Sequence, residues 1–152
     1  MAELETIADA LRLAIIREGH ACEFYKQLAL MVGSEELRDL VLSLAEEELE
    51  HKRKLEFELI KQGVVSRGVR AEVRFSVGKY LEEPASPEGL DYKEVMLLAI
   101  EKERTSFRLY ALLAGAVDDE EMQEGLLAMA EEEAKHMMRF EEAYREATSN
   151  QG

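Results

Sequence analysis

The motif Glu-x-x-His occurs twice in this 152-residue chain and constrains its fold more than any other feature. Glu48 pairs with His51 in the run 46–51, and Glu133 pairs with His136 in the second half. Residues three apart on a helix share one face, about 5–6 Å apart at Cβ. A carboxylate and an imidazole placed in this way can bind one metal ion while the carboxylate reaches a second. Two such pairs on two helices therefore suggest part of a dinuclear site in a helix bundle.

The two halves of the chain repeat with a constant offset. A lone glutamate precedes each motif, Glu18 in the first half and Glu103 in the second. The residue numbers differ by 85 for both types of glutamate and for the histidines (103 − 18, 133 − 48 and 136 − 51). The same offset relates Tyr25 to Tyr110. Each half is therefore predicted to be a helical hairpin that carries one lone Glu and one Glu-x-x-His.

Apolar residues at helical spacing predict four helices in a single domain covering 1–152. The helices are expected at about 3–32, 35–62, 92–114 and 119–147. Ser34 is placed to cap the second helix, and Asp91 with Glu94 forms a capping box at the start of the third. Gly63 and Gly115 are expected to end the second and third helices.

The segment 64–91 has no sustained helical period and contains both prolines. Its length of about 28 residues exceeds the 2–8 residues usual between adjacent antiparallel helices. It suits a crossover along the length of a bundle, with a short helix or an extended piece around 72–81 both left open. The fold class predicted is all-α, an antiparallel four-helix bundle made of two repeated hairpins and a long crossover linker.

Each lone glutamate is expected at the same height in the bundle as the motif glutamate of its hairpin. Gly33 is the midpoint between 18 and 48, Asp118 is the midpoint between 103 and 133, and both lie in predicted turns. About 15 residues of helix, roughly 22 Å, separate each glutamate from its turn. Six residues of metal-ligand type are therefore predicted at mid-height of the core: Glu18, Glu48, His51, Glu103, Glu133 and His136.

Solvated surface is the alternative interpretation of these glutamates, because the chain is acidic and charged runs usually face water. The four glutamates, however, occupy the apolar stripes of their helices. Burying an unpaired carboxylate is very unfavourable, and four facing one another would repel. Metal cations relieve that repulsion, and oxygen with imidazole donors suits iron or manganese. We therefore favour a metal site and interpret Glu46, Glu47 and Glu50 as solvated surface.

Composition excludes several other classes of function. The net charge of −14, from 19 Lys and Arg against 33 Asp and Glu, argues against a nucleic-acid or anionic-membrane surface. No apolar run approaches the ~20 residues of a membrane span. No signal peptide is evident, so a reducing cytoplasm is the expected location. Cys22 is the only cysteine, interpreted as a buried structural thiol, and it cannot form a disulfide or a four-cysteine iron site within the chain.

A Glu from each of two helices with Glu-x-x-His from the other two is the ligand set of ferritin-like di-iron and di-manganese proteins. The surrounding residues resemble, more narrowly, the rubrerythrin family. In the first half the resemblance lies in Ala14–Glu18 with Phe24 and Tyr25, and in Leu44–Glu48 with His51. In the second half it lies in Ala99–Glu103 with Tyr110, and in Ala130–Glu133 with His136. It covers the four helices, 1–62 and 92–147, and not the linker.

The resemblance implies two iron ions, with manganese as the alternative metal. Glu18 and His51 would hold one ion, Glu103 and His136 the other, and Glu48 with Glu133 would bridge them. Tyr25 and Tyr110 would bond to ligands of the opposite hairpin, with ordinary core packing as their other interpretation. The family also suggests a homodimer.

Two departures from the family bear on function. Typical rubrerythrins carry an extra glutamate where this chain has Ser106, so we expect no exchange of a glutamate for a histidine ligand and expect His51 to stay bound. The four-cysteine rubredoxin module is missing from this sequence, so electrons would come from a separate donor protein. The expected function is reduction of hydrogen peroxide at a di-iron centre. Ferroxidase chemistry with O2, a di-manganese catalase and a helical scaffold with a structural metal are the alternatives.

Overall fold

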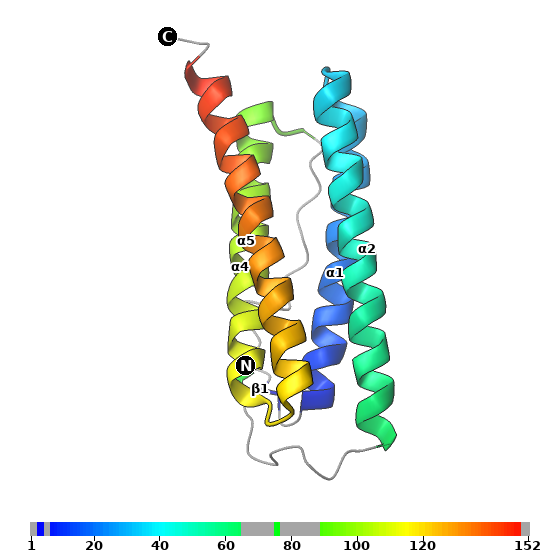
Figure 1. Ribbon diagram of the computed structural model, residues 1–152. Helices are drawn as coiled ribbons and strands as arrows, with labels where there is room; N and C mark the ends of the chain where they lie inside the picture. Colours follow the sequence, from blue (N-terminus) through cyan, green and yellow to red (C-terminus); the bar gives the residue numbers. More distant parts are fainter. Residues whose placement is uncertain (1–2, 5–6, 65–74, 77–88, 150–152) are drawn as a thin grey trace.

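The computed structural model describes residues 3–4, 7–64, 75–76 and 89–149, and four long helices account for most of them (Figure 1). The helices are α1 (Ile7–Met31), α2 (Glu35–Val64), α4 (Tyr92–Ala116) and α5 (Glu120–Ser149). Two short strands, β1 (Glu3–Leu4) and β2 (Phe75–Ser76), pair antiparallel with Glu3 opposite Ser76. The predicted all-α bundle of two helical hairpins is confirmed.

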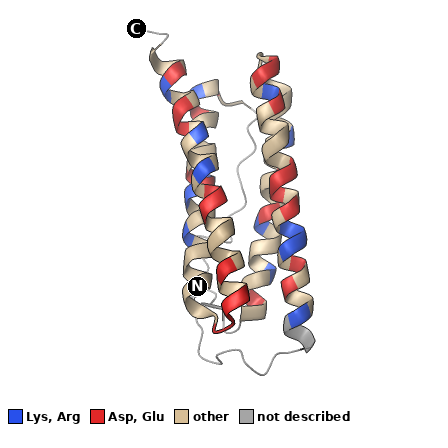
Figure 2. Ribbon diagram, in the orientation of Figure 1, with Lys and Arg blue, Asp and Glu red and all other residues tan. Residues whose placement is uncertain are grey.

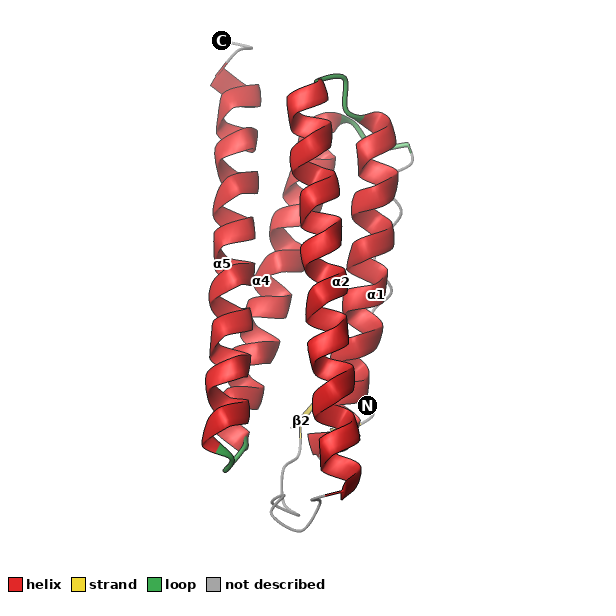
Figure 3. Cartoon of the chain, turned by 45° about the vertical axis from the view of Figure 1, so that its right-hand side comes forward, coloured by secondary structure: helices red, strands yellow, loops and turns green. Residues whose placement is uncertain are grey.

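The two hairpins turn at opposite ends of the bundle (Figure 3). Helix α1 packs mainly on α2, and α4 packs mainly on α5. Helix α2 finishes at the end of the bundle opposite to the one where α4 begins (Figure 1), so their connection joins the two ends, as the predicted crossover requires. Apart from β2, the residues expected to form a helix or an extended piece around 72–81 lie outside the described part of the chain.

Several helix ends differ from the sequence-based expectation. Helices α2 and α4 continue through Gly63 and Gly115 by one residue each. A glycine inside a helix costs only about 0.5–1 kcal/mol relative to alanine. Burial of Leu113, Ala114 and Val117 around the last turn of α4 opposes that small cost. Helix α1 begins at Ile7 rather than at residue 3, because Glu3–Leu4 instead pairs with β2.

The predicted helix caps are present. The backbone N–H of Glu94 donates to Asp91 Oδ1 at 2.8 Å, and Asp91 has the extended backbone of an N-cap residue. The backbone N–H of Leu37 donates to Ser34 Oγ at 3.3 Å. Each side chain satisfies a backbone donor that the first turn of a helix leaves without an intrahelical partner.

We expect Asp91→Ala to lower the free energy of unfolding by about 1 kcal/mol, since the substitution removes this capping bond. Urea unfolding of the metal-free protein measures the effect. Glu56→Ala, at an exposed position inside α2, is the control and should change stability little. Equal stabilities for the two variants would show that the Asp91 cap contributes nothing.

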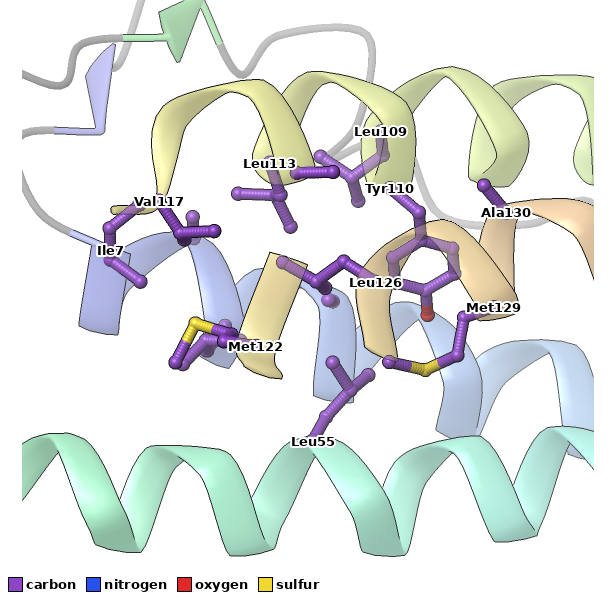
Figure 4. Packing of buried hydrophobic residues seen from close by; sticks show 14 of the residues in the cluster. Ile7, Leu55, Leu109, Tyr110, Leu113, Val117, Met122, Leu126, Met129 and Ala130 are labelled. Atoms are coloured by element: carbon purple, nitrogen blue, oxygen red, sulfur yellow. The ribbon is translucent and has the colours of Figure 1, made fainter. Parts of the chain in front are cut away.

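The apolar core forms two clusters. One, shown in part in Figure 4, includes Leu11 of α1, Leu55 of α2, Leu113 of α4 and Leu126 of α5. The other includes Leu28, Leu44, Met96 and Phe140. Apart from Ser106, the buried polar and charged residues of the described chain are the six predicted metal ligands. No described helix is both long and apolar enough to cross a membrane.

Candidate metal centre

The structure brings together all six residues predicted as metal ligands. Each of the four helices contributes at least one of the six residues, because a glutamate interrupts the apolar, core-facing side of each helix near the middle of its length. None of the six is more than 2% exposed. The contributions are Glu18 from α1, Glu48 and His51 from α2, Glu103 from α4, and Glu133 and His136 from α5. Acidic residues mark both α2 and α5 around this level (Figure 2).

The six residues form two overlapping groups. One contains Glu18, Glu48, His51 and Glu133, and the other contains Glu48, Glu103, Glu133 and His136. Within each group, one ligand atom from every residue lies within 4.8 Å of the others. Glu48 and Glu133 belong to both groups. This is the arrangement that two neighbouring ions bridged by two carboxylates would require.

The imidazoles approach carboxylates of both hairpins. His51 Nδ1 lies 2.8 Å from Glu133 Oε1 and 3.6 Å from Glu18 Oε2. His136 Nδ1 lies 3.0 Å from Glu48 Oε1 and 3.5 Å from Glu103 Oε2. Each histidine is therefore close to the lone glutamate of its own hairpin and to the motif glutamate of the other. The site has the same twofold repetition as the sequence.

Although these atoms lie close to one another, every one of the six residues has a buried side-chain atom that makes no hydrogen bond of suitable geometry within the described part of the chain. These atoms are Glu18 Oε2, both oxygens of Glu48, His51 Nδ1, Glu103 Oε2, both oxygens of Glu133, and His136 Nδ1. Leaving a buried polar group unpaired costs about 1–3 kcal/mol, and more for a charged group. Cations between these atoms would satisfy all of them, and oxygen with imidazole donors suits iron or manganese. The residues thus fit the pair of metal ions that the family resemblance implies.

Burial and mutual repulsion make the two shared carboxylates hard to ionise. Loss of hydration, followed by the charges of the neighbouring glutamates, raises the pKa of Glu48 and of Glu133 well above the usual range. The pKa of Glu103 is lowered instead, because contacts with Glu133, His136 and Tyr25 outweigh its burial. A metal ion would take the place of the protons on Glu48 and Glu133, so metal binding should release protons.

Two buried tyrosines connect the hairpins through the lone glutamates. The hydroxyl of Tyr25 donates to Glu103 Oε1, and that of Tyr110 donates to Glu18 Oε1. These are the bonds expected to ligands of the opposite hairpin. Burial, and then the adjacent carboxylate, raises the pKa of both tyrosines well above the usual value, which keeps them protonated as donors. Each bond uses one carboxylate oxygen and leaves Oε2 of the same glutamate available.

Glu47 was wrongly interpreted as solvated surface. Its Oε2 lies 3.0 Å from His136 Nε2, across the bundle. Its repeat equivalent, Glu132, contacts His51 Nε2 in the same way. The two glutamate side chains are 42% and 40% exposed, respectively. The available signal was the repeat, since both residues directly precede a motif glutamate.

The Nε2–H groups of His51 and His136 donate to Glu132 and Glu47, respectively, which orients the imidazoles and leaves Nδ1 for a metal ion. Burial alone would lower the pKa of His51, but the carboxylates of Glu18 and Glu132 outweigh it and raise the pKa. For Glu132 both effects have the opposite sign. Burial alone would raise the pKa of this carboxyl, but its contact with His51 and the charge of Lys54 outweigh burial and lower the pKa. Glu46 and Glu50 are exposed, as the sequence suggested.

We expect Glu132→Ala to weaken metal binding about 10–100-fold while two ions still bind, because His51 loses the partner that orients it. Anaerobic Fe(II) titration against a competing chelator measures the affinity. Glu131→Ala, at the exposed neighbouring position, serves as the control. An unchanged metal affinity in Glu132→Ala would show that Glu132 does not orient His51 for metal binding.

Ser106 and Cys22 stay outside both ligand groups. Ser106 is 7% exposed, and its Oγ accepts from Arg17 Nη2 at 3.5 Å. It has no carboxylate to offer as an extra ligand, as expected from the sequence. Cys22 is buried, as predicted, and burial raises the pKa of its thiol.

Solved structures with this fold come from several organisms. A protein from Thermotoga maritima, described as a ferritin-like diiron-carboxylate protein, is 22% identical with a TM-score of 0.79, covering 93% of this chain and 96% of its own. A hypothetical protein from Pyrococcus furiosus is 24% identical with a TM-score of 0.71, covering 91% and 88%. A dodecameric thioferritin, the bacterioferritin-related protein from Bacteroides fragilis, is 19% identical with a TM-score of 0.69, covering 95% and 89%. At these identities the likeness establishes the fold, which is ferritin-like.

A family model settles the classification more narrowly. A search of the curated proteins finds no match. The model named Rubrerythrin, however, matches residues 9–88 and 94–152, and these two segments contain all six predicted ligands. The chain belongs to the rubrerythrin family.

Proposed function

We propose that this chain holds two iron ions and reduces hydrogen peroxide, with electrons supplied by a separate donor protein. The observation that supports the metal pair is the set of buried, unpartnered nitrogen and oxygen atoms contributed by all six convergent residues. Family membership supports the identity of the metal as iron, with manganese as the alternative. Two adjacent ferrous ions can supply the two electrons that cleavage of an O–O bond consumes.

In this proposal Glu18 and His51 would hold one ion, and Glu103 and His136 would hold the other. Glu48 and Glu133 would be shared by the two ions, as their membership of both ligand groups suggests. The positive charge of the ions would offset the mutual repulsion of the buried carboxylates.

Groups around the ligands have two further roles. Tyr25 and Tyr110 hold the lone glutamates in position, and each keeps a proton on a hydroxyl one hydrogen bond from a ligand. The two apolar clusters limit the access of bulk water. The single cysteine cannot form a four-cysteine iron site within this sequence, and we propose that the electrons that restore the ferrous state come from a separate donor protein. We further propose a homodimer as the assembly.

Ferroxidase chemistry, the oxidation of Fe(II) by O2, is the second candidate. The serine at position 106 favours ferroxidase chemistry. Typical rubrerythrins carry at this position an additional glutamate that takes part in ligand exchange, and this chain lacks it. In that case the iron would be the substrate as well as the metal at the site.

Stopped-flow mixing distinguishes these functions. The metal-free protein is loaded anaerobically with Fe(II) and then mixed separately with H2O2 and with O2. Rapid formation of ferric absorption with peroxide and a slow response to O2 would support peroxide reduction, and the reverse would support ferroxidase chemistry. Bound iron that reacts with neither oxidant would indicate a structural metal and contradict the proposal. Oxygen evolution from peroxide by the manganese-loaded protein would indicate a catalase.

A further inference from the structure

The candidate metal centre is enclosed on most sides, so metal ions need a route to it. All six ligand residues are buried. Along the bundle axis, the apolar cluster shown in Figure 4 lies toward the α4–α5 turn, and the second cluster lies toward the α1–α2 turn. A charged ion does not pass through packed apolar side chains without a large cost. Helices α1 and α2 pack on each other, as do α4 and α5, which closes two further sides. The sides between α1 and α4 and between α2 and α5 remain.

The side between α1 and α4 is bridged by hydrogen bonds and carries positive charge. The two tyrosine–glutamate hydrogen bonds of the centre both run between these helices. Arg17 of α1 donates to Ser106 Oγ of α4 at 3.5 Å, and Lys102 Nζ of α4 lies 4.8 Å from the ring centroid of Phe24 on α1. Each of the two cations directly precedes a lone glutamate in the sequence. Their charges would repel a metal cation that approached from this side.

The side between α2 and α5 carries carboxylates that reach from solvent to the ligands. Glu47 of α2 contacts His136 Nε2, and Glu132 of α5 contacts His51 Nε2. Both glutamate side chains are partly exposed, and Glu132 also lines a groove of about 400 Å³ between the two helices. Each carboxylate therefore links the surface to a buried imidazole. Of the two remaining sides, this one has the charge that attracts a metal cation.

Neighbouring cations leave these two carboxylates available. Arg53, which lines the same groove, pairs with Glu50 at 3.5 Å. Lys54 lies near enough to Glu132 for its charge to act on that carboxyl. In the described part of the chain, however, neither Glu47 nor Glu132 forms an ion pair with a lysine or an arginine. Each can therefore turn toward an incoming cation without first breaking such a pair.

Each imidazole stands between a partly exposed carboxylate and the buried ligand oxygens. Its Nε2 faces the partly exposed glutamate, whereas its Nδ1 faces the centre. His51 Nδ1 lies 2.8 Å from Glu133 Oε1, and His136 Nδ1 lies 3.0 Å from Glu48 Oε1. The two rings are nearly parallel, at 15°, with their centroids 6.4 Å apart. Rings held in this way block the route from the surface to the buried oxygens, and a ring that is released at Nε2 can turn and open it.

We propose that Glu47 and Glu132 form the entrance through which metal ions reach the centre, and that their contacts with the histidines act as its latch. This rests on the proposed metal pair and not on peroxide chemistry. Each carboxylate turns from Nε2 toward the entering cation, and the freed imidazole rotates and uncovers the buried oxygens of Glu48 and Glu133. When the ring returns, its contact with the carboxylate forms again and Nδ1 faces the centre.

An entrance and a purely orienting contact affect different rates. If Glu47 and Glu132 only orient the imidazoles, their loss speeds the dissociation of the metal and leaves its association unchanged. If they form the entrance, loss of their charge slows association, because the carboxylates no longer attract the cation to the latch. The association rate constant for Fe(II) therefore separates the two roles.

The test variant carries Glu47→Gln and Glu132→Gln. The amide oxygen of glutamine can still accept from Nε2–H, so the orienting bond is kept while the charge is lost. Metal-free protein is mixed anaerobically with Fe(II) in a stopped-flow instrument. Tyrosine fluorescence follows binding, since the chain has no tryptophan and two of its tyrosines bond to ligands. We expect the association rate constant to fall at least about tenfold.

The matched control carries Glu46→Gln and Glu131→Gln, which remove the same two charges from exposed positions next to the entrance residues. Its association rate constant should stay within about twofold of that of the unmodified chain, since surface charges in water interact weakly. An unchanged rate constant in Glu47→Gln with Glu132→Gln, or an equal fall in the control, would overturn the proposal.

A variant with Glu47→Asp and Glu132→Asp provides an independent test, because it keeps the charges and shortens the side chains that reach Nε2. We expect association at least as fast as in the unmodified chain, and faster dissociation into an excess of chelator. Association slowed as much as in the glutamine variant would overturn the role of charge. Absence of Fe(II) binding to the unmodified chain would contradict the metal pair and the entrance together. A bound metal pair that does not react with peroxide would contradict the proposed function alone, because the rate comparison does not use peroxide.

Discussion

We expect a variant that carries both Glu48→Ala and Glu133→Ala to lose the binding of both metal ions. These two residues belong to both ligand groups, so their removal leaves each group with one carboxylate and one imidazole. We expect Fe(II) to raise the melting temperature of the unmodified chain and to leave that of the double variant unchanged. At a free metal concentration 100 times the dissociation constant, binding adds about 2.7 kcal/mol of stability for each site. For a chain of this size, each site corresponds to an increase of roughly 5–10 °C.

The matched control is the double variant Glu46→Ala with Glu131→Ala, at exposed positions two residues before the shared glutamates. It makes the same chemical change at equivalent places in the repeat and should keep the full metal-induced increase. Normal metal binding by Glu48→Ala with Glu133→Ala would show that the buried cluster is not the metal site.

The second large effect is a fall in the stability of the metal-free protein as pH rises. The folded state raises the pKa of Glu48 and Glu133 well above the usual carboxyl range, and it also raises the pKa of His51 and His136. The folded protein therefore binds more protons than the unfolded chain above the ordinary pKa of these groups. Their contribution is fully present below that pKa and is lost as pH rises through the folded-state value. We expect the melting temperature of the metal-free protein to be several degrees higher at pH 5.5 than at pH 8.

The source of this pH dependence can be checked with Glu48→Gln and Glu133→Gln together. Glutamine keeps the shape of the side chain and cannot ionise, so the double variant should be more stable than the unmodified chain at pH 8 and should vary less with pH. Metal loading of the unmodified chain should reduce the dependence as well, because the ions replace the protons. A metal-free protein that becomes more stable between pH 5.5 and pH 8 would contradict the account of the buried carboxylates.

The repeat explains why most of the fold was predictable from the sequence. Because each hairpin carries its own turn and its own polar interruption of the apolar stripe, helix spacing alone places Glu18 level with Glu48 and Glu103 level with Glu133. The two hairpins pack against each other because the apolar sides of their helices must be buried, and this brings the four glutamates together. The local signals at Ser34 and Asp91 depend on neighbouring residues only, and both caps are present.

Other features depend on distances between elements that a sequence pattern does not contain. Glu47 and Glu132 are partly exposed, and their contacts with histidines exist only because α2 and α5 lie close together at that level. The pairing of Glu3–Leu4 with β2 joins residues far apart in the chain, so no local periodicity indicates it. The continuation of α4 beyond Gly115 reflects tertiary burial that outweighs the low helix propensity of glycine.

Mössbauer spectroscopy of the protein loaded with ⁵⁷Fe tests the central claim most directly. The metal-free chain receives two equivalents of ⁵⁷Fe(II) without oxygen and is then oxidised with one equivalent of H2O2. If Glu48 and Glu133 bridge the ions, both irons bind and give the spectrum of a coupled diferric pair with no net spin. A spectrum of isolated high-spin ferric ions, or binding of only one iron per chain, would contradict the shared-carboxylate centre.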